Sequence, residues 1–126
     1  MTRLSPPAIG TIQQFAQSMD VTAYEAPDGA YSFDFETNGR LSISGAEDDK
    51  VVVSLTSRLL FEDMRGFAVL MPLAGYRAEI DEIVHVGLNK AGQGMLGVKT
   101  AVNSFNLPFL ERAFAVMTES FGRIAR

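Results

Sequence analysis

The sequence predicts an α+β fold in one domain, residues 1–126, with the order helix, three-stranded antiparallel meander, helix, β-hairpin, helix (α-β-β-β-α-β-β-α). Apolar residues recur at helical spacing near both ends of the chain. Between those ends, short segments alternate apolar and polar residues with the two-residue period of strands, and turn residues separate them. A chain of 126 residues is long enough for one hydrophobic core but not for two.

The first element is a short amphipathic helix from Pro7 to Met19. Ser5 can cap it, and prolines at its start cost no intrahelical hydrogen bond. Residues 20–29 then read as a connection. The apolar face consists of Ile9, Ile12, Phe15, Ala16 and Met19.

Three strands follow. Residues 31–36 alternate aromatic and polar side chains, and Asn38-Gly39 suits a tight hairpin turn. Residues 41–44 alternate again, and the acidic turn 47–49 leads to a third strand over 50–56. The middle of the chain is therefore predicted to be an antiparallel meander.

The segment from Leu59 to Tyr76 is predicted to be a second helix. Its stretch 67–71 is apolar on every side, so the helix needs cover on both sides, and a second subunit is a natural source of it. Pro72 should kink or end the helix. Residues 77–81 then return the chain to the sheet.

A β-hairpin and a last helix close the domain. The hairpin strands are predicted at 83–88 and 95–102, around a turn at 89–94. They are more continuously apolar than the meander, which predicts cover on both faces. Asn106 can cap the last helix, whose apolar stripe is Phe109, Leu110, Ala113, Phe114, Val116, Met117, Phe121 and Ile124.

Composition excludes several classes of function. A net charge of −4 without a basic cluster disfavours nucleic-acid binding, and 47% hydrophobic residues disfavour disorder. Without Cys there is no disulfide, thiol nucleophile or Cys-based metal site. No apolar run is long enough to span a bilayer. We expect a protein that is not exported and binds neither membrane nor nucleic acid.

No residue pattern predicts catalysis, a metal or a cofactor. His85 is the single histidine and is interpreted as a structural or interface residue, because zinc sites need several N or S ligands. The acid pairs at 48–49, 62–63 and 81–82 are typical of solvated turns and helix starts. Gly92-Gln93-Gly94 precedes a strand, whereas phosphate loops precede a helix.

Taken together, the order of elements resembles that of the class I type III secretion chaperones, the family that includes the chaperone of the intimin receptor Tir. The resemblance extends from about Ile9 to Gly122. It rests on the first helix, the apolar middle helix and three short segments, which are Tyr31-Ser32-Phe33-Asp34-Phe35, Val84-His85-Val86-Gly87-Leu88-Asn89 and Leu107-Pro108-Phe109-Leu110.

The resemblance implies a homodimer in the bacterial cytosol. Such a protein binds the N-terminal region of a secreted effector and keeps it soluble and competent for secretion, without catalysis or a cofactor. By likeness, candidate effector-binding residues are Ile12, Phe15, Met19, Phe33, Phe35, Leu41 and Ile43. Candidate dimer-interface residues are Phe61, Met64, Phe67, Leu70, Met71, Ile83 and His85.

Two other hypotheses remain open. The same fold could serve a regulator that binds a different, folded protein partner. A small enzyme or ligand-binding domain would instead need a ligand-sized pocket near His85, under the hairpin. The aromatic strand 31–35 is predicted to pack in the core or to form a partner-binding face, since its acidic neighbours disfavour stacking on RNA bases.

Overall fold

Seven antiparallel strands form a single sheet in the computed structural model, which describes residues 3–36, 38–61 and 64–124. The strands are β1 (Tyr24–Glu25), β2 (Tyr31–Phe35), β3 (Gly39–Ala46), β4 (Lys50–Leu60), β5 (Gly75–Arg77), β6 (Glu82–Leu88) and β7 (Gln93–Ala101). The helices are α1 (Pro6–Met19), α2 (Met64–Leu70) and α3 (Leu107–Ile124), with 3-10 turns η1 (Met71–Leu73) and η2 (Val102–Ser104).

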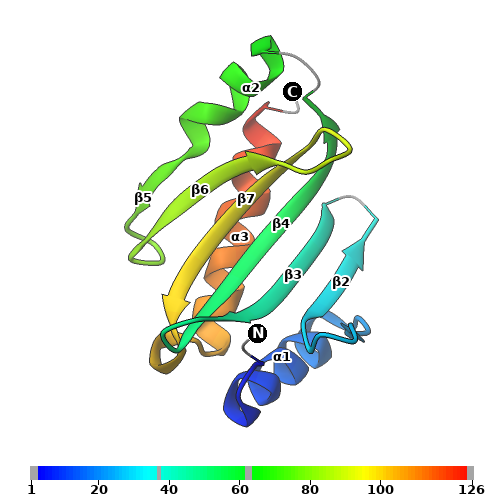
Figure 1. Ribbon diagram of the computed structural model, residues 1–126, viewed down its shortest axis with the longest axis vertical. Helices are drawn as coiled ribbons and strands as arrows, with labels where there is room; N and C mark the ends of the chain where they lie inside the picture. Colours follow the sequence, from blue (N-terminus) through cyan, green and yellow to red (C-terminus); the bar gives the residue numbers. More distant parts are fainter. Residues whose placement is uncertain (1–2, 37, 62–63, 125–126) are drawn as a thin grey trace.

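The sheet has the order β1-β2-β3-β4-β7-β6-β5, with the long strand β4 at its centre (Figure 1). β4 pairs with β3 on one side, Leu41 opposite Leu55, and with β7 on the other, Leu55 opposite Leu96. α3 runs behind the sheet, and α1 lies beside its lower end (Figure 1). The α+β class and the antiparallel sheet predicted from sequence are confirmed.

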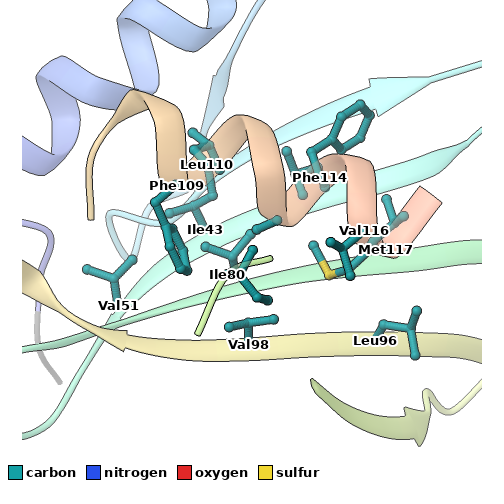
Figure 2. Packing of buried hydrophobic residues seen from close by; sticks show 14 of the residues in the cluster. Ile43, Val51, Ile80, Leu96, Val98, Phe109, Leu110, Phe114, Val116 and Met117 are labelled. Carbon is teal, nitrogen blue, oxygen red and sulfur yellow. The ribbon is translucent and has the colours of Figure 1, made fainter. Parts of the chain in front are cut away.

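Side chains from α1, α3 and the sheet form one core. Phe15 of α1 packs edge-on against Phe33 of β2 and Phe114 of α3, with ring centroids 5.5 Å and 5.8 Å apart. Residues of α3 and β7 face one another across the core, and Ile80, from the turn before β6, enters between them (Figure 2). The core therefore joins both ends of the chain to the sheet.

Local sequence signals set the ends of the helices. The Oγ of Ser5 accepts a hydrogen bond from the Ala8 amide at 3.4 Å, and Asp20 closes α1 with a φ of 54°. Asn106 Oδ1 accepts a bond from the Phe109 amide at 2.9 Å, which is the predicted cap of α3. Each side chain satisfies a backbone N–H that has no partner inside its helix.

The predicted helix from Leu59 to Tyr76 is wrong in its bounds. β4 continues to Leu60, which pairs with Gln93 of β7 after a bulge, so sheet hydrogen bonds replace the start of that helix. α2 ends at Leu70 because Pro72, the second residue of the 3-10 turn that follows, cannot donate an α-helical hydrogen bond. The short strand β1 lies in the predicted connection 20–29, and β5 lies where the predicted helix ends and the loop 77–81 begins.

Within the single chain only one face of the β6–β7 hairpin is covered, whereas cover on both faces is predicted from the sequence. Val84 is buried under α3, but its neighbours Ile83 and His85 are exposed on the other face. Val69 and Met71, in the apolar middle segment, are likewise about half exposed. Within the described part of the chain, no helix covers the face of the sheet turned toward the viewer in Figure 1.

One buried hydroxyl predicts a stabilising substitution. Thr100 Oγ1 in β7 is buried against the core and finds no hydrogen-bond partner among the described residues. Thr100→Val should therefore raise the free energy of unfolding by about 1 kcal/mol, because a buried unpaired hydroxyl is replaced by a methyl group. Urea titration measures this gain.

The matched control for that substitution is Thr118→Val. Thr118 Oγ1 donates to the Ala115 carbonyl at 3.1 Å and is partly exposed, so no comparable gain is expected there. An unchanged or lowered unfolding free energy in Thr100→Val would mean that the hydroxyl is satisfied in solution.

Candidate protein-binding surfaces

The sheet face turned away from α1 and α3 is called here the open face. Strand alternation places on it Ser42, Ser54, Thr56, Gly97 and Lys99 of the central strands and Tyr76, Ile83 and His85 at the β5–β6 side. The central part is mostly polar, although Val52 and Met95 also lie on it, whereas the β5–β6 side carries the large exposed side chains of Tyr76 and Ile83. The open face therefore has two regions of different chemistry.

Large apolar side chains are concentrated at the end of the molecule formed by α2, β5 and β6. Of the nine that are exposed among the described residues, seven lie between Leu59 and Leu88. Tyr76 and Ile83 are direct cross-strand partners and are 61% and 53% exposed. We call this region the apolar end, and it comprises Leu60, Val69, Met71, Tyr76, Ile83 and Leu88.

Contacts on Gly94 of β7 hold α2 in place. A Cβ on Gly94 would lie 2.6 Å from the Phe61 ring and 3.5 Å from Leu70 Cδ1. Both side chains therefore occupy the space beside the Gly94 backbone that a side chain would fill. The Phe61 amide also donates to the Gly92 carbonyl at 2.7 Å. Phe61 and Leu70 therefore pack against β7 through their buried side chains, while Val69, next to Leu70, is exposed.

Arg77 fastens β5 to α3. Its Nη1 donates to Ser120 Oγ at 3.2 Å, and its Nη2 lies 2.6 Å from Glu79 Oε2. The hydrogen bond from Arg77 holds the pKa of Glu79 below its usual range. Tyr76, next to it, donates to Asp81 Oδ1 at 2.8 Å, and this bond raises the pKa of Tyr76. These contacts fix the edge strand that presents Tyr76.

The opposite edge of the sheet carries a smaller apolar region. β1 pairs only with Tyr31 and Ser32, and Tyr24 is 64% exposed on it. Met19, at the end of α1, is partly exposed as well. A strand this short leaves backbone groups near the edge available to another extended chain.

An apolar hollow of about 190 Å³ opens between the end of β4 and the end of α3. Its lining comes from β4 and α3, with Asn38 of the β2–β3 turn, and comprises Asn38, Ser57, Arg58, Leu59, Thr118, Phe121 and Gly122. A hollow of this size can receive one apolar side chain of a bound polypeptide.

Two solved structures with the same architecture contain secretion chaperones. The chain superimposes on the Yersinia pestis type III secretion chaperone SycH, solved in complex with a stable fragment of YscM2, with a TM-score of 0.64 and 9% identity over 91% of this chain and 98% of that one. It matches the HopA1–SchA chaperone–effector complex with a TM-score of 0.64 and 15% identity over 90% of each chain. The protein has the fold of the type III secretion chaperones.

The secretion-chaperone fold also resembles a protein of another description. YbjN from E. coli, described as a candidate transcription regulator, matches with a TM-score of 0.51 and 13% identity over 96% of both chains. No protein-family model matches the sequence, and no curated protein matches it. At these identities the likeness establishes the fold.

Within the secretion-chaperone fold, most of the predicted effector-binding side chains lie in the core. Ile12 and Phe15 of α1 and Phe33, Leu41 and Ile43 of the sheet are only 0–1% exposed, because they belong to the core between the helices and the sheet. In the single chain their side chains are therefore not on the surface. Met19 is exposed, and Phe35 is half-buried with its ring centroid 4.8 Å from that of Phe114. These two remain candidates.

The predicted dimer-interface residues divide in the same way. Phe61 and Leu70 are buried against Gly94, and Phe67 is partly buried, so they support α2 from inside the chain. Met71, Ile83 and His85 are exposed together at the α2–β6 side. The side chain of Met64 lies outside the described residues.

Sequence patterns missed several exposed residues of the apolar end. The sequence predicts Tyr76 at a helix end and Leu60 at a helix start, whereas both lie in strands. It predicts that Val69 and Leu88 belong to covered elements, whereas both are exposed in the single chain. The one signal available was the alternation at 82–88, which places Ile83 and His85 on the face opposite Val84.

Other kinds of site have little support in the described residues. None of their His, Asp and Glu side chains gather in a group of three that could hold a metal ion. None of the helices in the described ranges is long and apolar enough to cross a membrane. His85 is exposed and lines none of the three best-formed hollows in the described part of the chain.

Proposed function

We propose that this protein is a homodimeric chaperone of the bacterial cytosol that binds the N-terminal region of a secreted protein and keeps it soluble and competent for secretion. The observation that carries the proposal is the apolar end, exposed on a chain with the secretion-chaperone fold. The role is binding, without a catalytic step or a cofactor.

The apolar end is the proposed dimer interface. Exposed clusters of large apolar side chains usually mark a surface that another protein covers. A twofold axis would bring Ile83 and Tyr76 of one copy against the same patch of its partner, since dimers of this kind use one self-complementary surface. The packed support beneath α2 keeps the patch rigid enough for such pairing.

Cargo would bind at the remaining apolar features. The 190 Å³ hollow can take one side chain, and Met19, Tyr24 and Phe35 offer shallow contacts near the β1 edge. An extended segment could add backbone hydrogen bonds at that edge. Each apolar side chain that is buried contributes roughly 1–3 kcal/mol before ordering costs are subtracted. Affinity then comes from several weak contacts spread over the surface.

Ile83→Asp tests the dimer. Because Ile83 is 53% exposed, the variant should fold normally, but it would bury an unpaired carboxylate in the interface. The dimer dissociation constant should rise by roughly 100-fold or more, as measured by analytical ultracentrifugation.

Tyr24→Asp is the matched control, because Tyr24 is at least as exposed (64% against 53%) but lies at the opposite edge of the sheet. It should leave the dimer intact. A wild-type chain that is monomeric, or an Ile83→Asp variant that dimerises as tightly as the wild type, contradicts the proposed interface.

The chaperone role needs a separate experiment. The tagged protein is captured from its native bacterium and the intact complex is weighed by native mass spectrometry. Two copies with one larger protein are expected, and limited proteolysis should cut the bound N-terminal region of that protein readily because it is held extended. Secretion of that protein should fall when the chaperone gene is deleted.

A second candidate is a regulator that binds a folded partner, and the likeness to YbjN favours it. Both candidates predict a protein partner, so the state of that partner distinguishes them. A partner that stays folded and protease-resistant in the complex, and whose secretion is unaffected, would favour the regulator.

A further inference from the structure

A polar hollow of about 380 Å³ lies on the open face, where the β2–β3 and β6–β7 turns approach one another. Its floor follows one cross-strand row, from Asp34 through Arg40 and Thr56 to Met95. Arg58, Asn89 and Gln93 complete the wall. The volume is at the lower end of the range of small-ligand sites.

Close backbone packing makes room for this hollow. Gly39, which also lines it, has a φ of 101°, and a Cβ there would lie 2.0 Å from the Thr56 carbonyl oxygen. Only glycine permits that approach of β3 to β4. The arginine that follows it, Arg40, is then placed over the floor of the hollow.

The charged groups of the hollow have a net positive charge. Arg40 and Arg58 contribute two positive charges and Asp34 one negative charge, on a protein whose net charge is −4. Asp34 uses only part of Arg40, through bonds of 2.8 Å to Nε and 3.2 Å to Nη2, so Nη1 stays available. The hydrogen bond from Arg40, together with the positive charge of both arginines, lowers the pKa of Asp34.

The other donors are held in position by local bonds. Arg58 Nη2 donates to the Phe35 carbonyl at 3.0 Å, and Arg58 forms no ion pair within the described residues. Asn89 Nδ2 donates to Gln93 Oε1 at 2.9 Å, which leaves the side-chain nitrogen of Gln93, Nε2, as a donor. Asn89 Oδ1 in turn accepts hydrogen bonds from the backbone N–H groups of Ala91 and Gln93, which fixes the Asn89 side chain. The hollow thus offers ordered hydrogen-bond donors.

We infer that this hollow is a carboxylate-binding site, with Arg58, Arg40 and Gln93 as the donors that hold the anion. Planar guanidinium groups bind carboxylates through charge-assisted hydrogen bonds. The carboxylate comes either from an acidic side chain of a bound polypeptide, in which case the site rests on the proposed function, or from a small free acid.

The test uses the full chain and three simple ligands, so it does not depend on knowing the cargo. The tripeptide Ac-Gly-Glu-Gly-NH2, its glutamine counterpart and sodium butyrate are titrated while the Thr56 and Met95 methyl resonances are followed by NMR. The glutamate peptide should shift both resonances and the glutamine peptide should not. Equal shifts from both peptides, or none from either, would overturn the site.

Variants then assign the donors. Arg58→Gln should weaken binding of the glutamate peptide about tenfold. Arg123→Gln, which removes an exposed arginine of α3, should leave it unchanged. Gln93→Glu retains the acceptor for Asn89 but adds a negative charge, so binding should be lost. Equal affinity in Arg58→Gln and Arg123→Gln would contradict the assignment.

The free acid distinguishes the two sources. Butyrate binding as tightly as the glutamate peptide supports the site and assigns it to a small acid. Tighter binding of the peptide supports the site and assigns it to a polypeptide. Because none of these measurements needs the partner protein, loss of the proposed chaperone function would leave their outcome unaffected.

Discussion

Gly39→Ala is expected to lower the free energy of unfolding by about 4 kcal/mol. A Cβ at this position would lie 2.0 Å from the Thr56 carbonyl oxygen, which is backbone and cannot move aside cheaply. The φ of 101° adds strain for any residue with a side chain. The two effects act on the β3–β4 pairing at the centre of the sheet, and urea denaturation followed by circular dichroism measures their sum.

Gly10→Ala is the control for this substitution. Gly10 lies inside α1 with no atom within 4 Å of an added Cβ, so alanine should stabilise the protein by about 0.5–1 kcal/mol through helix propensity. A Gly39→Ala variant as stable as the wild type would mean that β3 does not approach β4 as closely as described.

Gly94→Ala is expected to lower the unfolding free energy by about 2 kcal/mol and to loosen α2. The new Cβ would meet the Phe61 ring at 2.6 Å, and Phe61 is buried, so the ring must shift and carry the segment after it. Hydrogen exchange should rise in α2 more than in β3 or β4. Dimer affinity should fall as well, because the apolar end is built on this segment.

Gly87→Ala provides the comparison on the neighbouring strand. Gly87 faces Met95 across β6 and β7, and nothing lies within 4 Å of its added Cβ, so stability should change little. If Gly94→Ala lowered stability without faster exchange in α2, the support of that helix by Gly94 would be contradicted.

The order of the main elements could be predicted because each carries its own local signal. Ser5 and Asn106 cap α1 and α3 as predicted, and the alternation at residues 31–35 marks β2. The strands β1 and β5, of two and three residues, have no periodicity to detect. Their existence depends on neighbours that pair with them, which no local pattern reveals.

Prediction of the site failed where it depended on knowing which face is covered. An alternating strand shows that Phe33 and Leu41 share a face with other apolar residues, but a core face and a partner-binding face have the same pattern. The structure places α1 and α3 over that face, which buries both side chains. It also extends β4 to Leu60, because pairing with Gln93 outweighs helix formation there.

The sequence by itself determined the fold class, the helices α1 and α3, the turns of the meander and the likeness to secretion chaperones. These depend on spacing of apolar residues and on caps and turns, which act over a few residues. Only the tertiary structure decided which apolar residues are exposed, where α2 begins, and that Arg40 and Arg58 line the same hollow as Gln93. Those properties depend on contacts between segments far apart in the chain, since exposure and charge clustering arise only when the strands are paired and the helices have covered one face.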